Sequence, residues 1–147
     1  MNDPSNCYTI YGDGLNVRDW LFVEDHIEAL LLVIKKGEIG QCYCIGGFGE
    51  RTNKYIVELI CSILDKRKPA SSPHSKLIEY VKDRPGHDKR YAIDANKLKN
   101  ELGWEPSLQF EEGLAKTITW YLENQEWMDS VTSGEYQNYY KGVSMCY

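Results

Sequence analysis

The 147-residue sequence lacks the features that mark several large classes of protein. Its longest apolar run, Ala29–Ile34, is far shorter than the roughly 20 residues of a membrane-spanning helix. The N-terminus has neither the basic start nor the apolar core of a secretory signal. With 17 Lys and Arg against 22 Asp and Glu, no basic surplus is present to neutralise a nucleic-acid backbone. These absences predict a soluble, cytoplasmic protein that binds neither membrane nor nucleic acid.

Several cofactor, metal and catalytic motifs are also missing. The sequence has no Gly-x-Gly-x-x-Gly dinucleotide loop, no Walker loop and no Gly-x-Ser-x-Gly elbow. No tyrosine is followed four residues later by lysine, the pair that many short-chain dehydrogenases use. The five cysteines lack the spacing of a disulfide framework, and Cys42 and Cys44 have no second Cys or His pair to complete a metal site. We therefore expect this chain to hold no metal.

What is present is the composition of a globular domain, with 42% apolar and 27% charged residues. A length of 147 residues suits one domain or part of a larger protein. Apolar periodicity and turn residues predict an α/β chain. Strands are expected at residues 8–11, 19–22, 42–45 and 78–81, helices at residues 23–36, 52–66, 94–102 and 110–124, and an irregular tail from residue 130 onward.

The helix over residues 23–36 has the strongest local pattern. Its apolar positions follow the i, i+4, i+7, i+8 spacing of one helical face, namely Val23, Ile27, Leu30, Leu31 and Ile34. Acidic residues occupy its first turn and lysines its last, and Gly37 follows, so the charges match the helix dipole. The next predicted strand, residues 42–45, would bury its two cysteines as small apolar side chains.

Two arginines lie in contexts that suit an anion site. Arg18 follows the Gly12–Gly14 turn and precedes a strand, from where a guanidinium can reach into a cleft and bind an anion through two N–H groups. Arg84 shares a Pro-Gly turn with His87, which places a cation and a switchable donor on one rigid turn. Asn53 adds an amide at the start of a predicted helix.

Each of these residues also has a purely structural interpretation. Arg18 can form a surface ion pair with Asp19 or Glu24, as exposed arginines commonly do. Asp83 and Arg84 can pair with each other within their turn. The asparagine amide can be a solvated group of a first helical turn. The residues alone thus indicate an α/β unit with candidate anion-binding arginines.

Two stretches, Tyr11–His26 (YGDGLNVRDWLFVEDH) and Asp83–Asp88 (DRPGHD), are the most distinctive parts of the sequence. Further motifs follow in order at Ile45–Gly47, Glu50–Asn53, Arg90–Asp94, Glu101–Trp104, Phe110–Leu114 and Trp120–Tyr121. Together they resemble the dTDP-glucose 4,6-dehydratases of the extended short-chain dehydrogenase family. The likeness covers about residues 8–140, which is nearly the whole chain.

The resemblance implies binding roles for five residues. Arg18 and Arg84 would bind the nucleotide diphosphate, Asn53 and His87 would lie beside it, and Tyr11 would line the nucleoside pocket. The family reaction oxidises glucose C4 with bound NAD, eliminates water across C5 and C6, and returns the hydride to C6. It belongs to nucleotide-sugar and deoxysugar (dTDP-rhamnose) biosynthesis. The glycine-rich loop and the catalytic groups belong to the N-terminal half of the family, so this chain would hold no catalytic or cofactor-binding residue.

A domain organisation is implied as well. Residues 1–129 would be the C-terminal substrate-binding portion of an extended short-chain dehydrogenase, with residues 23–45 as the last helix and strand of its Rossmann domain beside a small mixed α/β substrate domain. Residues 130–147 would form a C-terminal tail, and the N-terminal NAD-binding domain would be absent. We then expect a chain inactive alone, with a dTDP-sugar nucleotide and the missing half as partners. Its uncovered surface would also allow self-association.

Two other functions are open at this stage. The motifs Glu101–Trp104 and Phe110–Gly113 are shared by many nucleotide-sugar enzymes, so a fragment of a UDP-sugar epimerase or decarboxylase is an alternative, although Arg18–Trp20 and Asp83–His87 point more to the dehydratases. It can also be a non-catalytic module that binds a nucleotide sugar or a partner protein. Competition between dTDP and UDP for the site separates the two enzyme classes.

Overall fold

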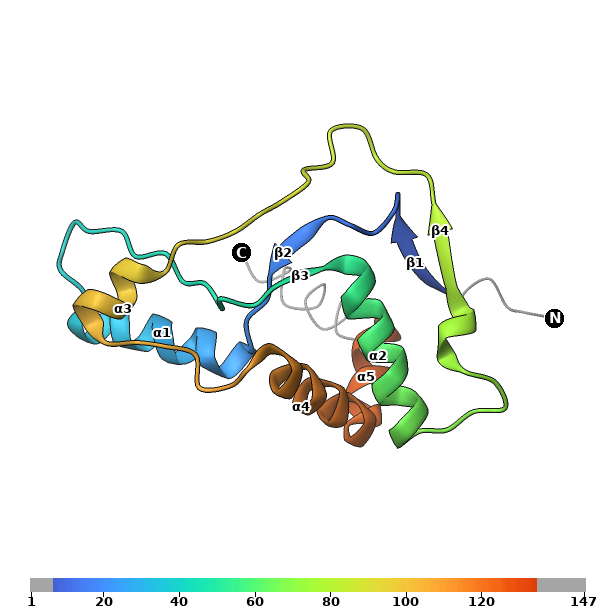
Figure 1. Ribbon diagram of the computed structural model, residues 1–147. Coiled ribbons are helices and arrows are strands. Elements are labelled where there is room, and N and C mark those ends of the chain that lie inside the picture. Colours follow the sequence, from blue (N-terminus) through green and yellow to red (C-terminus); the bar gives the residue numbers. More distant parts are fainter. Residues whose placement is uncertain (1–6, 135–147) are drawn as a thin grey trace, which may run out of the picture.

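Helices lie along one side of two small sheets in the computed structural model, which describes residues 7–134 (Figure 1). The strands are β1 (Tyr8–Tyr11), β2 (Val17–Asp19), β3 (Glu50–Thr52) and β4 (Ile78–Val81). The helices are α1 (Val23–Lys36), α2 (Asn53–Arg67), α3 (Asn96–Leu102), α4 (Phe110–Glu123) and α5 (Gln125–Thr132), with a 3₁₀ helix at His74–Leu77. This is a partial α/β fold.

Backbone pairing joins segments that lie far apart in the sequence. β1 runs parallel to β4, so that Tyr8–Tyr11 lies opposite Ile78–Val81. A parallel pair needs a crossover connection, and α2 lies within the segment that makes it. β2 runs antiparallel to β3, with Arg18 opposite Arg51. After β4 the chain crosses the molecule in one long excursion to reach α3 (Figure 1).

The buried side chains form two groups. In the first, Ala29 of α1 packs with Leu98 of α3 and with Trp104. Six partly buried side chains surround them, namely Leu21, Leu32, Val33, Tyr43, Ile45 and Leu102. The second group follows α2, which contacts both β1 and α4 and buries Ile56 and Cys61. The segment after β4 therefore links two packed regions.

Most predicted helices are confirmed. α1 has the predicted bounds, and α4 ends one residue before its predicted end. α2 begins directly after Thr52, whose hydroxyl accepts a hydrogen bond from the Tyr55 N–H at 3.2 Å. α3 begins at Asn96, two residues after its predicted start, and ends before Gly103, which has φ +73° and supplies the left-handed conformation that commonly follows a helix. The strands at residues 8–11 and 78–81 are also confirmed as β1 and β4.

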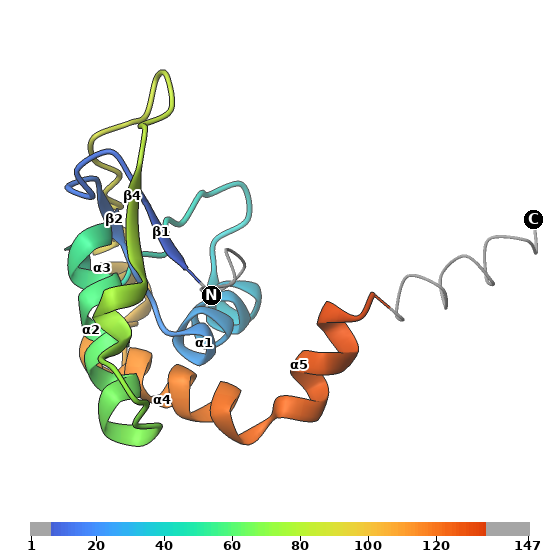
Figure 2. The ribbon, with the colours of Figure 1, turned by 90° about the vertical axis from the view of Figure 1, so that its right-hand side faces the viewer.

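Other expectations from the sequence are wrong. β2 covers Val17–Asp19 rather than residues 19–22, because its pairing with β3 ends where Asp19 meets Glu50. Residues 42–45 form no strand, since no strand within residues 7–134 pairs with them, and Cys42 and Cys44 are exposed rather than buried. α5, which extends away from the body of the fold, runs through the expected start of the tail at residue 130 (Figure 2). The rest of that tail, residues 135–147, lies outside the described residues.

α1 turns its predicted apolar stripe outward. Its five members, 45–79% exposed, are Val23, Ile27, Leu30, Leu31 and Ile34, and we call them the apolar face of α1. The side of α1 that faces the core instead buries Ala29 and Asp25, whose Oδ1 accepts a hydrogen bond from the Ser107 N–H. Every helix within residues 7–134 falls short of the length and apolar character that crossing a membrane requires.

Candidate functional site

Three segments that carry predicted binding residues meet around Val17. On one side, Val17 pairs with Thr52, which directly precedes Asn53. On the other side, the Val17 N–H donates to the Lys89 carbonyl oxygen at 2.8 Å, and the Val17 carbonyl oxygen accepts from the Tyr91 N–H at 3.0 Å. β2 thus lies between β3 and residues 89–91. The residues next to Val17, including Arg18, are placed between these two segments.

The Arg18 side chain is held by the segment that follows the Pro-Gly turn. Its Nη2 donates to the Asp88 carbonyl oxygen at 3.0 Å, and its Nη1 donates to the Val17 carbonyl oxygen at 2.6 Å. Its Cζ lies 4.7 Å from the centre of the Tyr91 ring, a cation–π contact. A guanidinium carries five N–H donors, so these two bonds leave three for a ligand. Within residues 7–134, Arg18 forms no ion pair with a carboxylate, which removes the surface-pair interpretation.

Neighbouring arginines are used differently. The Arg90 guanidinium donates two hydrogen bonds to the Glu50 carboxylate, each at 2.8 Å, and this contact lowers the pKa of Glu50 below its ordinary value. Arg51, opposite Arg18 in the sheet, forms an ion pair with Glu111 at 2.9 Å. These two cations are already neutralised by carboxylates. The charge of Arg18 therefore stays available to an anion, whereas the charges of Arg51 and Arg90 are compensated by carboxylates.

The N-terminus of α2 is attached to the turn between β1 and β2. The Asn53 N–H donates to the Asn16 carbonyl oxygen at 3.0 Å, and the Lys54 N–H donates to the Gly14 carbonyl oxygen at 2.9 Å. These backbone donors are therefore engaged within the protein, and Asn53 has its side-chain amide to offer a ligand. The buried Asn16 side chain also donates to the Asp88 carbonyl oxygen at 3.1 Å. Asn16 ties the start of α2 to the Pro-Gly turn.

The Pro-Gly turn is braced from within. The Asp83 carboxylate accepts a hydrogen bond from the Arg84 backbone N–H at 2.9 Å, and its Oδ1 lies 2.6 Å from His87 Nδ1. The hydrogen bond from His87 is the main cause that holds the pKa of Asp83 below its ordinary value. The His87 side chain is only 6% exposed, so its ring is fixed by packing as well as by this bond. Tyr11 precedes Gly12, whose N–H donates to the Val81 carbonyl oxygen beside this turn.

Tyr91 links Arg18 to Asp88, in the segment that also carries Arg84. Its hydroxyl donates a hydrogen bond to the Asp88 carboxylate, and this bond is the main cause that raises the pKa of Tyr91. The positive charges of Arg18 and Arg84 both oppose that rise in the pKa. This position of Tyr91 is not visible in the sequence pattern.

Asp19 is a second residue whose role the sequence does not reveal. Its carboxylate accepts hydrogen bonds from the Gly47 N–H at 2.8 Å and the Gly49 N–H at 2.9 Å. A side chain at position 47 would clash with the Trp20 carbonyl oxygen, so this position requires glycine. Between the two glycines Phe48 adopts φ +51°, a conformation rare for a bulky residue. Asp19 therefore fixes the loop that leads into β3.

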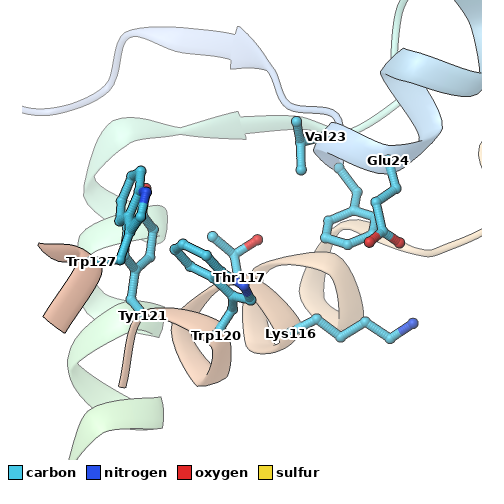
Figure 3. A pocket seen from close by; sticks show the side chains of 8 residues that line it. Val23, Glu24, Lys116, Thr117, Trp120, Tyr121 and Trp127 are labelled. Carbon is cyan, nitrogen blue, oxygen red and sulfur yellow. The ribbon is translucent and has the colours of Figure 1, made fainter. Parts of the chain in front are cut away.

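A separate cavity of about 500 Å³ lies between the start of α1 and the α4–α5 corner (Figure 3). Trp120, Tyr121 and Trp127 form its aromatic wall, and Val23 lies across from them at the start of α1. Phe22 also lines the cavity. None of the five residues predicted to bind the nucleotide lines it. Within residues 7–134, no group of three or more His, Cys, Asp or Glu side chains is arranged to hold a metal ion.

The fold and the joined segments define a class, the extended short-chain dehydrogenases. A solved dTDP-glucose 4,6-dehydratase from Bacillus anthracis in complex with NAD matches with a TM-score of 0.71 and 52% identity, covering 82% of this chain and 36% of that one. A dTDP-glucose 4,6-dehydratase from Streptomyces venezuelae matches at TM-score 0.73 and 38% identity, covering 82% and 35%. A UDP-glucose 4-epimerase from Thermotoga maritima follows at TM-score 0.69 and 29% identity, covering 83% and 37%.

Within this class the sequence matches one family model. The model described as GDP-mannose 4,6 dehydratase covers residues 3–117, and the chain belongs to that family. It is 54% identical over 130 residues to the dTDP-glucose 4,6-dehydratase of Xanthomonas campestris pv. campestris, covering 87% of this chain and 37% of that protein. The corresponding protein of Escherichia coli K12 is 50% identical over 130 residues, with 88% and 36% covered. The chain thus spans little more than a third of these relatives.

Proposed function

We propose that this chain is the nucleotide-sugar-binding part of a dTDP-glucose 4,6-dehydratase. The observation that carries the proposal is the uncompensated charge of Arg18, which forms no ion pair within residues 7–134 while the nearby Arg51 and Arg90 are paired with carboxylates. Arg18 also donates to the carbonyl oxygen of Asp88, in the segment that bears Arg84. Two arginines on joined segments suit a diphosphate, whose oxygens accept hydrogen bonds from guanidinium groups. The dehydratase relatives at 50–54% identity support dTDP-glucose as the substrate.

Each predicted residue has a task in this proposal. Arg18 and Arg84 bind the two phosphates, and the Asn53 side-chain amide donates beside them. His87 has Nδ1 engaged by Asp83, which leaves Nε2 for the ligand. Tyr11, 51% exposed at the end of β1, lines the nucleoside end. The proposal gives this chain binding and orientation, and no acid, base or hydride transfer.

The redox chemistry is assigned to the part of the relatives that this chain does not span. The sequence offers neither a glycine-rich loop nor a tyrosine–lysine pair, so its residues do not fit an NAD site. The relatives solved with NAD are nearly three times as long as the matched region, which leaves room for such a site. We therefore propose that NAD binds the other portion, and that turnover requires both.

The apolar face of α1 is the proposed contact with that portion. A continuous exposed apolar stripe is uncommon on a lone domain and marks a surface that another element covers. Residues 42–45, between α1 and β3, pair with no strand within residues 7–134, and Ile39 before them is fully exposed. Val23 belongs both to the apolar face and to the aromatic cavity of Figure 3, so the two surfaces are continuous.

Calorimetric titration of the purified chain with dTDP, UDP and thymidine tests the binding role. We expect dTDP to bind, and Arg18→Ala to weaken it by about 10- to 100-fold, the loss expected for a charge-assisted contact. Arg67→Ala at the end of α2 is the matched control and should leave the affinity unchanged. Equal affinity for UDP would favour the epimerase class instead.

An assay of dTDP-glucose with NAD tests the proposal that turnover requires a second portion that binds NAD. We expect no 4-keto-6-deoxy product from the chain alone, because it supplies no cofactor site. Product formed by the purified chain would contradict this part of the proposal. Failure of dTDP to bind at all would contradict the binding role itself.

A further inference from the structure

We propose that Tyr91 is a positioning residue for Arg18, which sets the plane in which the guanidinium meets its anion. The inference rests on the proposed function for the identity of the anion, a nucleoside diphosphate. A planar guanidinium binds phosphate oxygens through parallel N–H groups, so its orientation matters as much as its charge. Arg18 stands on a strand of only three residues, and that strand supplies one acceptor for the guanidinium, the Val17 carbonyl oxygen.

The contacts of Tyr91 form a closed cycle. Its ring lies 4.7 Å from Arg18 Cζ, and its hydroxyl donates to the Asp88 carboxylate. The backbone carbonyl of the same Asp88 accepts from Arg18 Nη2 at 3.0 Å. The guanidinium is thus contacted at one face by the Tyr91 ring and at one N–H group by the Asp88 carbonyl, and Asp88 links both. Its Nη1 donates to the Val17 carbonyl oxygen at 2.6 Å.

Burial does not account for Tyr91. The residue is 53% exposed, more than an aromatic side chain with only a packing role requires. Its backbone N–H pairs with the Val17 carbonyl oxygen independently of the side chain. Changes to the ring should therefore leave this ladder of hydrogen bonds in place. A variant that lacks the Tyr91 ring should therefore still fold.

Substitutions of Tyr91 in the full chain test the inference by calorimetry. Tyr91→Leu removes the ring and should weaken dTDP binding by about two- to fivefold, the range of an exposed cation–π contact, with thymidine binding unchanged. Tyr91→Phe keeps the ring and loses only the hydroxyl bond, so its effect should be smaller. Tyr80→Leu, at 51% exposure on β4, is the matched control and should change neither affinity.

A double-mutant cycle separates positioning from a general structural effect. If Tyr91 acts through Arg18, then Tyr91→Leu should cause no further loss of dTDP affinity in an Arg18→Ala background. An equal loss in both backgrounds, or an equal loss for thymidine and dTDP, would overturn the inference. So would unchanged dTDP binding by Tyr91→Leu in the otherwise native chain.

A measurement without ligand keeps the inference distinct from the proposed function. ¹⁵N relaxation of Arg18 Nε should show a more mobile guanidinium in Tyr91→Leu than in the native chain or in Tyr80→Leu. Unchanged mobility would overturn the positioning role whatever the nucleotide result. If native Arg18 is ordered by Tyr91 but dTDP does not bind, the proposed function fails and the positioning role stands.

Discussion

Single residues near the site differ chiefly in how their charges are compensated. Arg51 and Arg90 each meet a carboxylate, whereas Arg18 meets two carbonyl oxygens and a ring. A carbonyl or a ring orients a guanidinium without cancelling its charge, so an anion still gains from binding it. Asp83 differs from Arg18, because its partner His87 is an ionisable side chain of the same turn.

Removal of the His87 ring should raise the pKa of Asp83. In His87→Ala the main cause of the depressed pKa is lost, so the value should return part of the way toward about 3.9, since the Arg84 N–H still donates. A ¹³C titration of the carboxyl groups measures this. The pKa of Asp65, depressed by His74 in the same manner, is the internal control and should not move.

The sign of the pH effect follows from that depression. A carboxylate whose folded-state pKa is lowered contributes stability above its unfolded pKa and loses it as pH falls through the folded value. The turn at residues 83–88 should therefore lose protection from hydrogen exchange as pH falls below about 4. His87→Ala should show less of this loss. An Asp83 pKa that is the same in both proteins would contradict the assigned cause.

At the scale of elements, the cap of α2 is also a support of the site. Thr52→Ala removes the acceptor of the Tyr55 N–H and should lower the free energy of unfolding by about 1 kcal/mol, measured by urea denaturation. Thr52→Ser keeps a hydroxyl and should retain most of the stability. If serine and alanine cost the same, the hydrogen bond contributes nothing and the methyl group accounts for the loss.

The helices could be predicted from sequence because their signals are local. The charges and Gly37 around α1, the hydroxyl of Thr52 and Gly103 after α3 all lie within a few residues of the ends they mark. The strand expected at residues 42–45 fails for the opposite reason, because strand pairing depends on a distant neighbour.

The residues of the candidate site fall into the same two groups, those with a local sequence signal and those that depend on tertiary contacts. Arg18, Arg84, Asn53 and His87 could be named as candidates because their residue types and turns suit an anion, although only the resemblance to a family joined them, and their binding roles stay predictions. Tyr91 and Asp19 could not be predicted, since each acts through a contact with a segment that is distant in sequence or through backbone groups. A sequence pattern indicates which interactions a side chain is capable of, whereas the tertiary structure determines which residues it contacts.

At the scale of the whole molecule, the apolar face of α1 should govern association and not stability. The pair Ile27→Lys and Ile34→Lys, at residues 50% and 79% exposed, should leave the free energy of unfolding within about 0.5 kcal/mol while reducing self-association in sedimentation experiments. Ala29→Lys, on the buried side of the same helix, is the control and should cost about 3 kcal/mol or more. Unchanged association in the double variant would show that another surface is responsible.

The two packed regions are held together by contacts of long sequence separation, and this sets the order in which the molecule can form. The Asn16 and Arg18 side chains reach the Asp88 carbonyl across 72 and 70 residues. Closing such a loop is entropically costly and is favoured only after the local elements exist. A chain made from its N-terminus therefore carries Arg18 without its ring partner until residue 91 has emerged. The anion site therefore forms only once this long loop has closed, so a nucleotide that binds the closed site would act on the folding reaction itself.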